Sequence, residues 1–294
     1  MRILVAGWQG QTARTFMDIA PARADITACA VGRPSLDVLE PRSIERALAD
    51  ITPDVVINSA AYTAVDAAED EPEQAFALNR DGARQLAHAA ARRGIPIIHL
   101  STDCVFDGSK TGPYTETDTP NPLSVYGQSK LAGEAAVREA NPHHIILRTA
   151  WMFSPFGRNF VKTMLQRASE GGPLRVVNDR HGSPTYVPHL VDAILAIAHK
   201  VKAGNGGDVW GVYHAAGSGT ATWYGMAAEI LRHSALHGGP VAELEAITAA
   251  EYPSRAPHPA NSQLDCSKLE RVFGLRLPPW QDSIGECVTR LLTR

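Results

Sequence analysis

The sequence has few cysteines and no long apolar run. Its 294 residues include 4 cysteines, which lie far apart without the short paired spacing of a zinc or dithiol site: Cys29, Cys104, Cys266 and Cys287. We therefore expect reduced thiols in a cytoplasmic protein. No apolar stretch approaches the ~20 residues that cross a bilayer, and the opening "MRILVAG" lacks the apolar region and cleavage site of a signal peptide. A disulfide scaffold and a membrane protein are both disfavoured.

An excess of charge of one sign is also missing. The 28 basic and 31 acidic residues give a net charge of -3, so no extended cationic surface is expected for nucleic acid or for a membrane. The histidines are scattered without metal-ligand spacing, and we predict no metal site. No Gly-x-Ser-x-Gly turn provides an acyl-transfer nucleophile. An acidic or phosphorylated small molecule remains compatible with this composition.

Short apolar, β-branched runs alternate with longer helical patterns along the chain. Strand after helix after strand predicts an α/β fold, a Rossmann-type doubly wound parallel sheet with helices on both faces. The predicted strands are 2–7, 25–34, 54–61, 95–103, 143–151, 174–179 and 209–217. A helix is predicted between Pro72, in its first turn, and Gly94, just past its end.

The pattern loosens after about Trp151 into segments rich in Pro and Gly, such as "NDRHGSPTYVP" and "AGNGGD". We predict a dinucleotide-binding domain over residues 1–150 and a mainly substrate-binding lobe over 151–294. Part of 173–215 is expected to return to the large sheet.

A glycine turn follows the first predicted strand in "ILVAGWQGQTA". Gly7 permits a sharp turn, Gly10 lets the backbone approach a pyrophosphate, and the small Ala13 allows close helix packing. Two glycines alone also fit an ordinary turn. Their position directly after a buried strand near the chain start favours a dinucleotide site.

The end of the second strand predicts which dinucleotide binds. An NAD site usually has an acidic residue there for the adenine ribose, but this chain has Ala30, Val31, Gly32 and Arg33. No carboxylate would repel a ribose phosphate, and Arg33 could bind it through a charge-assisted fork. We therefore predict NADPH as the preferred cofactor, with NADH as the alternative. The competing interpretation is that Arg33 is a solvated loop residue.

Further polar residues stand where a ligand is expected. Thr102 ends a predicted strand, where it could bind a carbonyl or simply cap a turn. Tyr126 and Lys130 lie four positions apart on one face of a predicted helix, which permits contact but does not prove chemistry. Asn79 lies with Ala83, Leu86 and Ala90 on the face of its predicted helix that should pack on the sheet. Because a buried amide needs partners, we expect a hydrogen bond to neighbouring strand backbone, a proton-relay role, or both.

Together, the glycine turn, "STD" and "YGQSK" resemble the extended short-chain dehydrogenase/reductase family. The match is closer to one branch of that family, the dTDP-4-dehydrorhamnose reductases, in "NSAAYTAVDAAEDEP", "STDCVFDG", "YGQSKLAGE", "RTAWMF", "NFVKTML", "VVNDRHGSPT" and "ANSQLD". These motifs span nearly the whole chain. The resemblance implies NADPH-dependent reduction of the C4 ketone of a nucleotide sugar, dTDP-4-dehydro-L-rhamnose.

The resemblance also implies roles for individual residues. Tyr126 would donate the proton, Lys130 would hold the nicotinamide ribose and draw the tyrosine toward its phenolate, and Thr102 would bind the carbonyl. The implied cofactor-binding residues are Gly7, Gly10, Gln11, Thr12, Arg33, Asp37, Ala60, Ala61, Tyr62, Asn79, Tyr126 and Lys130. The implied substrate-binding residues are Val65, Asp66, Thr102, Asp103, Val105, Phe106, Tyr126 and Trp151. For Trp151, a core aromatic is the alternative.

Some positions depart from the family pattern. Cys104 replaces a tyrosine and His258 replaces an arginine, which puts one hydroxyl and one diphosphate contact in doubt. Some relatives dimerise around magnesium held by acidic side chains. This chain has Thr15, Pro188 and His189 in those stretches, so we expect no metal and a monomer or weak homodimer.

Two other functions remain open. Another nucleotide-sugar reductase or epimerase would share the fold and cofactor. A non-catalytic regulatory subunit would belong to a different class, and the intact Thr102, Tyr126 and Lys130 argue against it.

Overall fold

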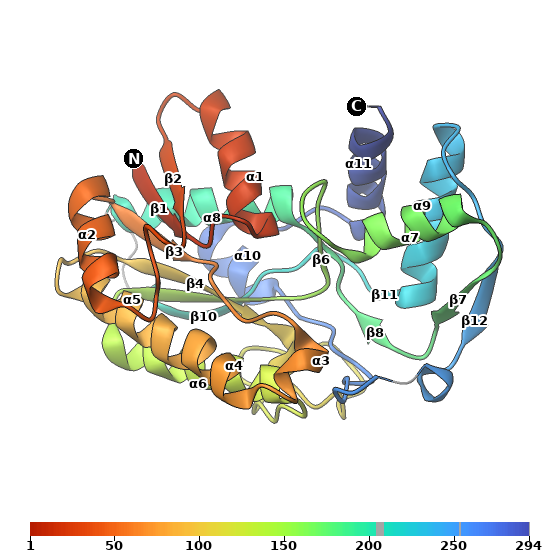
Figure 1. Ribbon diagram of the computed structural model, residues 1–294, viewed down its shortest axis with the longest axis horizontal. Coiled ribbons are helices and arrows are strands. Elements are labelled where there is room, and N and C mark those ends of the chain that lie inside the picture. The colour runs from red at the N-terminus through yellow and green to blue at the C-terminus, as the bar shows by residue number, and fades with distance from the viewer. Residues whose placement is uncertain (204–208, 253, 294) are drawn as a thin grey trace.

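The computed structural model describes residues 1–203, 209–252 and 254–293, so the predicted segment "AGNGGD" lies largely outside the described residues. The molecule has two parts. The larger part is built on a parallel sheet, and a smaller lobe lies beside it, at the right in Figure 1. No helix within the described ranges is long and apolar enough to cross a bilayer.

The larger part contains a six-stranded sheet in the order β10-β5-β4-β3-β1-β2. All neighbouring strands in it pair in parallel, which confirms the predicted doubly wound architecture. Its strands are β1 (Arg2–Ala6), β2 (Thr27–Val31), β3 (Val55–Asn58), β4 (Ile97–Thr102), β5 (His144–Thr149) and β10 (Gly211–His214).

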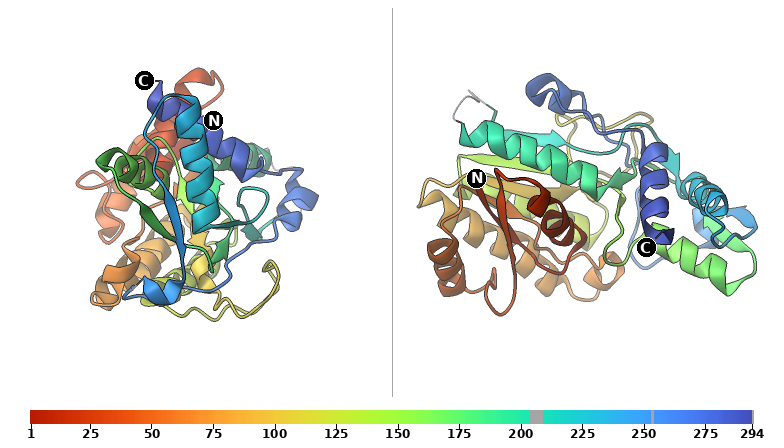
Figure 2. Two further views of the ribbon diagram at one scale, coloured as in Figure 1. Left: turned by 90° about the vertical axis from the view of Figure 1, so that its right-hand side faces the viewer. Right: turned by 90° about the horizontal axis from the view of Figure 1, so that it is seen from above.

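Both faces of the sheet are buried, as the continuous apolar runs predict. In β1, Ile3 and Val5 point into one apolar cluster and Leu4 and Ala6 into the other, because successive strand side chains alternate between faces. The helices α1 (Gln11–Ile19), η1 (Ala20–Ala22), α8 (Val187–Lys202) and α10 (Ser267–Phe273) lie on the first face. On the second face lie α2 (Pro41–Ile51), α5 (Ala83–Ala91) and α6 (Val125–Ala140), and Figure 2 shows both layers.

The helix predicted between Pro72 and Gly94 has a wider turn inside it. Its segments are α4 (Pro72–Phe76), a π-helical stretch η2 (Ala77–Gly82) and α5. A Cβ at Gly82 would lie 2.7 Å from Cγ2 of Val38, and one at Gly133 of α6 would lie 2.1 Å from the carbonyl oxygen of Asn79. The π turn is therefore packed tightly on both sides, as such turns often are near functional sites.

The smaller lobe has its own apolar cluster. Strand β7 carries the predicted "LRVV" segment and pairs with β12 in this lobe, whereas β10 lies beside β5 in the large sheet. The lobe contains α7 (Phe160–Glu170), β7 (Leu174–Val177), α9 (Trp223–Leu236), β12 (Leu244–Ile247), η4 (Ala249–Glu251) and α11 (Trp280–Leu292). Two further short pairs are β6 (Met152–Phe153) with β9 (Thr185–Tyr186), and β8 (His181–Gly182) with β11 (Ala221–Thr222).

Candidate active site

The glycine turn lies at the carboxyl end of β1, where the strand order of the sheet reverses. Gly7 has φ +102, and a Cβ there would lie 3.1 Å from the backbone nitrogen of Ala60. Its own nitrogen donates to Val31 O at 2.9 Å. A side chain is excluded by both the backbone conformation and the close approach of the loop after β3. The turn therefore forms the floor of the crevice in which open α/β sheets bind ligands.

Helix α1 begins directly at this turn and presents free backbone N–H groups. Its N-cap is Gly10, which provides no side-chain cap, and no acidic side chain lies in the first turn. The N-terminus of a helix attracts anions through these N–H groups and its dipole. Thr12 and Ala13 are buried behind the turn. These residues fit the pyrophosphate of a dinucleotide.

The side chain of Gln11 links this turn to the second lobe. Its Oε1 accepts from Ser154 Oγ at 2.8 Å and from Asn159 Nδ2 at 3.2 Å, and its Nε2 donates to Met152 O at 3.4 Å. The side chain is therefore used within the protein. The backbone of Gln11 and the second N–H of its Nε2 are left for a cofactor.

The end of β2 carries an uncompensated cation. Arg33 is exposed and makes no ion pair within the described part of the chain. The nearby Asp37 turns its carboxylate onto its own loop, where Oδ1 accepts from Leu39 N at 2.9 Å. The indole of Trp8 covers Gly32 so closely that a Cβ on that glycine would lie 2.1 Å from Trp8 Cδ1. A phosphate on the adenine ribose would meet a free guanidinium here.

Asn79 holds the loop that follows β3. Its Oδ1 accepts from Tyr62 N at 2.8 Å, and its Nδ2 donates to Tyr62 O at 3.1 Å and to Ser129 Oγ at 2.8 Å. The backbone partner is thus this loop, which also contains the predicted Ala60 and Ala61, and not a neighbouring strand. Asn79 has all of its hydrogen-bonding groups engaged and ties the loop to α6.

Helix α6 begins so that Tyr126 faces the end of β4. The side chain of Ser124 caps the helix by accepting from Gly127 N at 3.1 Å. A Cβ on Gly127 would lie 2.2 Å from the carbonyl oxygen of Cys104, so only glycine allows the first turn to pack this closely on the segment after β4.

Thr102, Tyr126 and Trp151 line one cavity of about 330 Å³, together with Val65, Asp103 and Cys104. The Thr102 hydroxyl donates to Asp103 Oδ1 at 3.0 Å and accepts from Cys104 N at 3.1 Å. We call this cavity the catalytic pocket.

Burial shifts the pKa of both Tyr126 and Lys130, which lie one turn apart on α6. Burial raises the pKa of Tyr126, the neighbouring Cys104 and Asp103 act in the same direction, and a hydrogen bond with Thr102 opposes them. Burial lowers the pKa of Lys130 to about 8, with Glu134 opposing the shift. The expected pull of the Lys130 ammonium toward a phenolate is therefore not what dominates at Tyr126. Lys130 Nζ instead donates to Leu100 O at 2.7 Å.

Cys104 is a poor nucleophile in this setting. Burial raises the pKa of its thiol, and the adjacent Asp103 adds to the shift. The thiol therefore stays protonated at neutral pH. Cys104 shapes the wall of the catalytic pocket.

Trp151 is held in an unusual backbone conformation. Its φ is +43, which is strained for a bulky residue and is typical of functional sites. Its indole lies against Gly182, where a Cβ would lie 2.3 Å from Trp151 Cε2. The ring also stacks on Trp223 with centroids 3.7 Å apart and planes at 10°. Trp151 thus joins the end of β5 to the second lobe.

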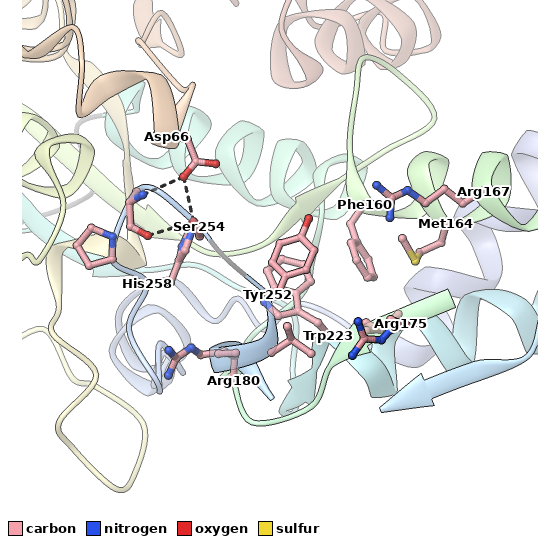
Figure 3. Close-up of a pocket in the computed structure, with 15 residues that line it drawn as sticks. Asp66, Phe160, Met164, Arg167, Arg175, Arg180, Trp223, Tyr252, Ser254 and His258 are labelled. Atoms are coloured by element: carbon pink, nitrogen blue, oxygen red, sulfur yellow. Dashed lines mark hydrogen bonds between the residues drawn. The ribbon is translucent and has the colours of Figure 1, made fainter. Parts of the chain in front are cut away.

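A larger cavity of about 540 Å³ continues from the catalytic pocket, and Arg180, Trp223 and His258 line both. Arginine and aromatic side chains surround it in Figure 3: Arg167, Arg175, Arg180, Phe160, Trp223 and Tyr252. Within the described residues, Arg167 and Arg180 make no ion pair, whereas Arg175 pairs with Glu245 and Glu251. The lining suits an anionic ligand with a flat ring.

Asp66 lines this larger cavity and fixes its wall. Its Oδ1 accepts from Ser254 Oγ and from Ala256 N, each at 3.0 Å. Val105 and Phe106 are fully buried behind the catalytic pocket and line neither cavity. Phe106 stacks on Tyr114 there, with centroids 4.1 Å apart.

Sequence reasoning missed Trp223 and the arginines at 167 and 175. They come from α7, β7 and α9, which meet only in the folded lobe. Arg180 lies within the quoted "VVNDRHGSPT" motif, which was the one available signal.

The parallel sheet, the glycine turn and the pocket that holds Thr102 and Tyr126 define a Rossmann-type oxidoreductase of the short-chain dehydrogenase/reductase class. Residues 1–293 match the family described as RmlD substrate binding domain, and the chain belongs to this family.

Similar proteins support this membership. A dTDP-4-dehydrorhamnose reductase of Sinorhizobium fredii is 46% identical, over 99% of this chain and 98% of its own. A dTDP-4-dehydrorhamnose reductase of Bacillus anthracis, solved in complex with NADP, superimposes with a TM-score of 0.90 at 30% identity, over 98% of this chain and 99% of its own. A probable dTDP-4,6-dihydroxy-2-methyloxan-3-one 4-ketoreductase of Streptomyces antibioticus is 37% identical, over 99% of this chain and 96% of its own.

Proposed function

We propose that this protein reduces the C4 ketone of dTDP-4-dehydro-L-rhamnose with NADPH to give dTDP-L-rhamnose. The observation that carries the proposal is the meeting of Thr102 and Tyr126 in a pocket at the carboxyl end of β4, with Lys130 one helical turn away. Residues 1–150 would bind mainly the cofactor, and 151–294 mainly the substrate.

The residues present fit the cofactor. The first turn of α1 would hold the pyrophosphate, Arg33 the ribose phosphate, and the loop at 60–62, fixed by Asn79, the adenosine side. NADPH supplies the hydride. The ammonium of Lys130 has three donors, of which Leu100 O occupies one. The remaining two would donate to the hydroxyls of the nicotinamide ribose.

Tyr126 would donate the proton to the oxygen that develops charge as the ketone is reduced. Its raised pKa keeps the phenol protonated at neutral pH, so that the proton is in place before hydride transfer. Thr102 would hold the carbonyl oxygen beside it once its hydroxyl proton turns from Asp103 Oδ1 to that oxygen. The tyrosinate that remains would be stabilised by the Lys130 ammonium.

The larger cavity would hold the nucleotide part of the substrate. We propose that Arg180 and His258, which line both cavities, bind the diphosphate between sugar and nucleoside. Trp151 and Trp223 would cover the sugar, and Tyr252 and Phe160 would contact the base.

Turnover of enzymatically prepared dTDP-4-dehydro-L-rhamnose, followed by NADPH absorbance, tests this function. Tyr126→Phe should lower the rate by ~10² to 10⁴-fold, the usual contribution of a positioned acid. Tyr224→Phe, off both cavities, is the matched control and should retain the rate. Equal rates for wild type and Tyr126→Phe would remove the proposed donor, and no turnover by wild type would refute this substrate.

A second candidate is a 4-ketoreductase of another dTDP-sugar, which the Streptomyces antibioticus relative favours. Comparing dTDP-4-keto sugars of different stereochemistry under the same assay separates the two. An epimerase would turn over without consuming NADPH, and a non-catalytic subunit would consume none with any sugar.

A further inference from the structure

A buried layer of charge lies directly behind the catalytic pocket. The side chains of Arg148 on β5 and Glu134 on α6 are 5% and 2% exposed. Arg148 Nη2 donates to Glu134 Oε2 at 2.7 Å and Arg148 Nε to Glu134 Oε1 at 2.9 Å. This bidentate fork fixes the carboxylate in both position and orientation.

Strand β4 provides a third anchor for that carboxylate. Ser101 Oγ donates to Glu134 Oε1 at 2.5 Å, and Ser101 lies opposite Arg148 in the register of β4 and β5. The next residue along β4 is Thr102. Glu134 is therefore hydrogen-bonded to the ends of β4 and β5, which carry the catalytic pocket. These three hydrogen bonds fix the position of its carboxylate.

Glu134 also lies one helical turn after Lys130, on the same buried side of α6. Lys130 is 3% exposed, so little solvent stabilises its charge. Two cations, Lys130 and Arg148, thus share this layer with one carboxylate. The guanidinium cannot release its proton, so Lys130 is the cation that would lose its charge if the carboxylate were neutralised.

We propose that Glu134 is a positioning residue that keeps Lys130 in its ammonium form. The proposal rests on the proposed function, because it assumes that Lys130 acts on the nicotinamide ribose and Tyr126. Glu134 touches neither cavity. It acts only through Lys130.

The other charged groups near Lys130 do not replace Glu134. His99 on β4 faces Lys130, and burial together with Lys130 lowers its pKa, so it stays neutral. Asp103, in η3 (Asp103–Val105), binds Thr102. The charged residues of the helices packed against α6, including α3 (Val65–Ala68), are not buried: Asp66, Glu69, Glu73, Arg80, Asp81, Arg84 and His88.

The direct test measures the Lys130 pKa by NMR of protein labelled at the lysine Cε, with Lys130→Arg identifying the signal. In Glu134→Gln, which keeps the side-chain shape, the pKa should fall by ~1 unit or more, the usual effect of a nearby charge. The matched control is Glu139→Gln, an exposed carboxylate on the same helix, which should titrate as wild type does. If Glu134→Gln does not fold, Glu134→Asp replaces it. The shorter aspartate keeps the negative charge but holds it farther from Lys130, so the Lys130 pKa should fall by less than in Glu134→Gln.

The second readout is the pH profile of turnover. The alkaline limb of Glu134→Gln should move to lower pH by the same amount as the Lys130 pKa, and Glu134→Asp should restore most of it. A purely structural role would lower thermal stability and leave both the Lys130 pKa and the limb at their wild-type positions, and that result overturns the proposal. Wild-type protein without turnover would instead refute the proposed substrate, while the NMR titration would still decide the role of Glu134.

Discussion

At the residue scale, the spacing of Tyr126 and Lys130 shows only that both could face one ligand. The packing decides more, because Gly127 lets α6 approach Cys104 and brings the tyrosine to Thr102. Glycine has no side-chain signal that reveals such a contact from sequence. The sequence thus predicts that Tyr126 and Lys130 share a helix face. It does not predict the contact of Tyr126 with Thr102, or Glu134 as the partner that sets the Lys130 charge.

Arg33 carries the prediction of cofactor choice. Arg33→Ala removes a guanidinium that has no acidic partner in the described structure, so the preference for NADPH over NADH should fall by roughly 10- to 100-fold, the value of a charge-assisted hydrogen bond. The measurement is kcat/KM with each cofactor.

Arg138→Ala is the control for this change, because Arg138 is an exposed residue in the last turn of α6. It should leave the preference unaltered. A wild-type protein that uses both cofactors equally, or an Arg33 variant with the wild-type ratio, would contradict the assignment.

At the element scale, the π turn in the 72–91 helix presents Asn79 to both the 60–62 loop and α6. Asn79→Ala would leave the N–H and carbonyl of Tyr62 without their bonds, at ~1–3 kcal/mol. We expect a higher KM for NADPH, a lower melting temperature and a smaller change in kcat. Cofactor titration, calorimetry and steady-state kinetics measure the three.

Ser129→Ala tests the bond from Asn79 to α6 separately from the bonds between Asn79 and the 60–62 loop. It removes one acceptor of Asn79 and keeps both bonds to Tyr62, so the KM for NADPH should stay near the wild-type value. If Asn79→Ala also left the KM unchanged, the loop would not need this anchor for cofactor binding.

The elements of the large sheet were predictable because each is an apolar run with its own turn signals. The π turn was not, because a wider helical turn arises from packing against Val38 and Gly133 and leaves the 3.6-residue apolar stripe nearly intact. The prediction that Asn79 bonds to a neighbouring strand is also wrong, because its backbone partner, Tyr62, lies in the loop after β3, and the path of that loop depends on the tertiary fold.

At the scale of the whole molecule, we expect a monomer or weak homodimer whose assembly is insensitive to chelators. Thr15 Oγ1 is engaged with Gln11 O at 2.8 Å, and His189 with Ser283 and Glu286. No group of three or more metal-binding side chains gathers in the described ranges. Size-exclusion chromatography with light scattering, with and without EDTA, is the measurement, and a dimer that EDTA dissociates would contradict this expectation.

The larger cavity shows why a cavity wall in the smaller lobe is hard to predict. Its wall combines α7, β7, α9 and the segment around 254–258, which are separated by tens of residues and carry no periodic signal in common. Only the tertiary fold brings Arg167, Arg175 and Trp223 to one cavity. The catalytic pocket is different, because parallel strands end at a shared edge and their last residues are neighbours by topology.

The stacked indoles of Trp151 and Trp223 have an optical consequence. Two parallel chromophores with centroids 3.7 Å apart share their electronic excitation, so the protein carries an exciton pair whose circular dichroism depends on how the rings face each other. One ring belongs to the segment after β5 and the other to α9. The circular dichroism of this pair therefore reports how the two parts are aligned beside the catalytic pocket, and it requires no added label.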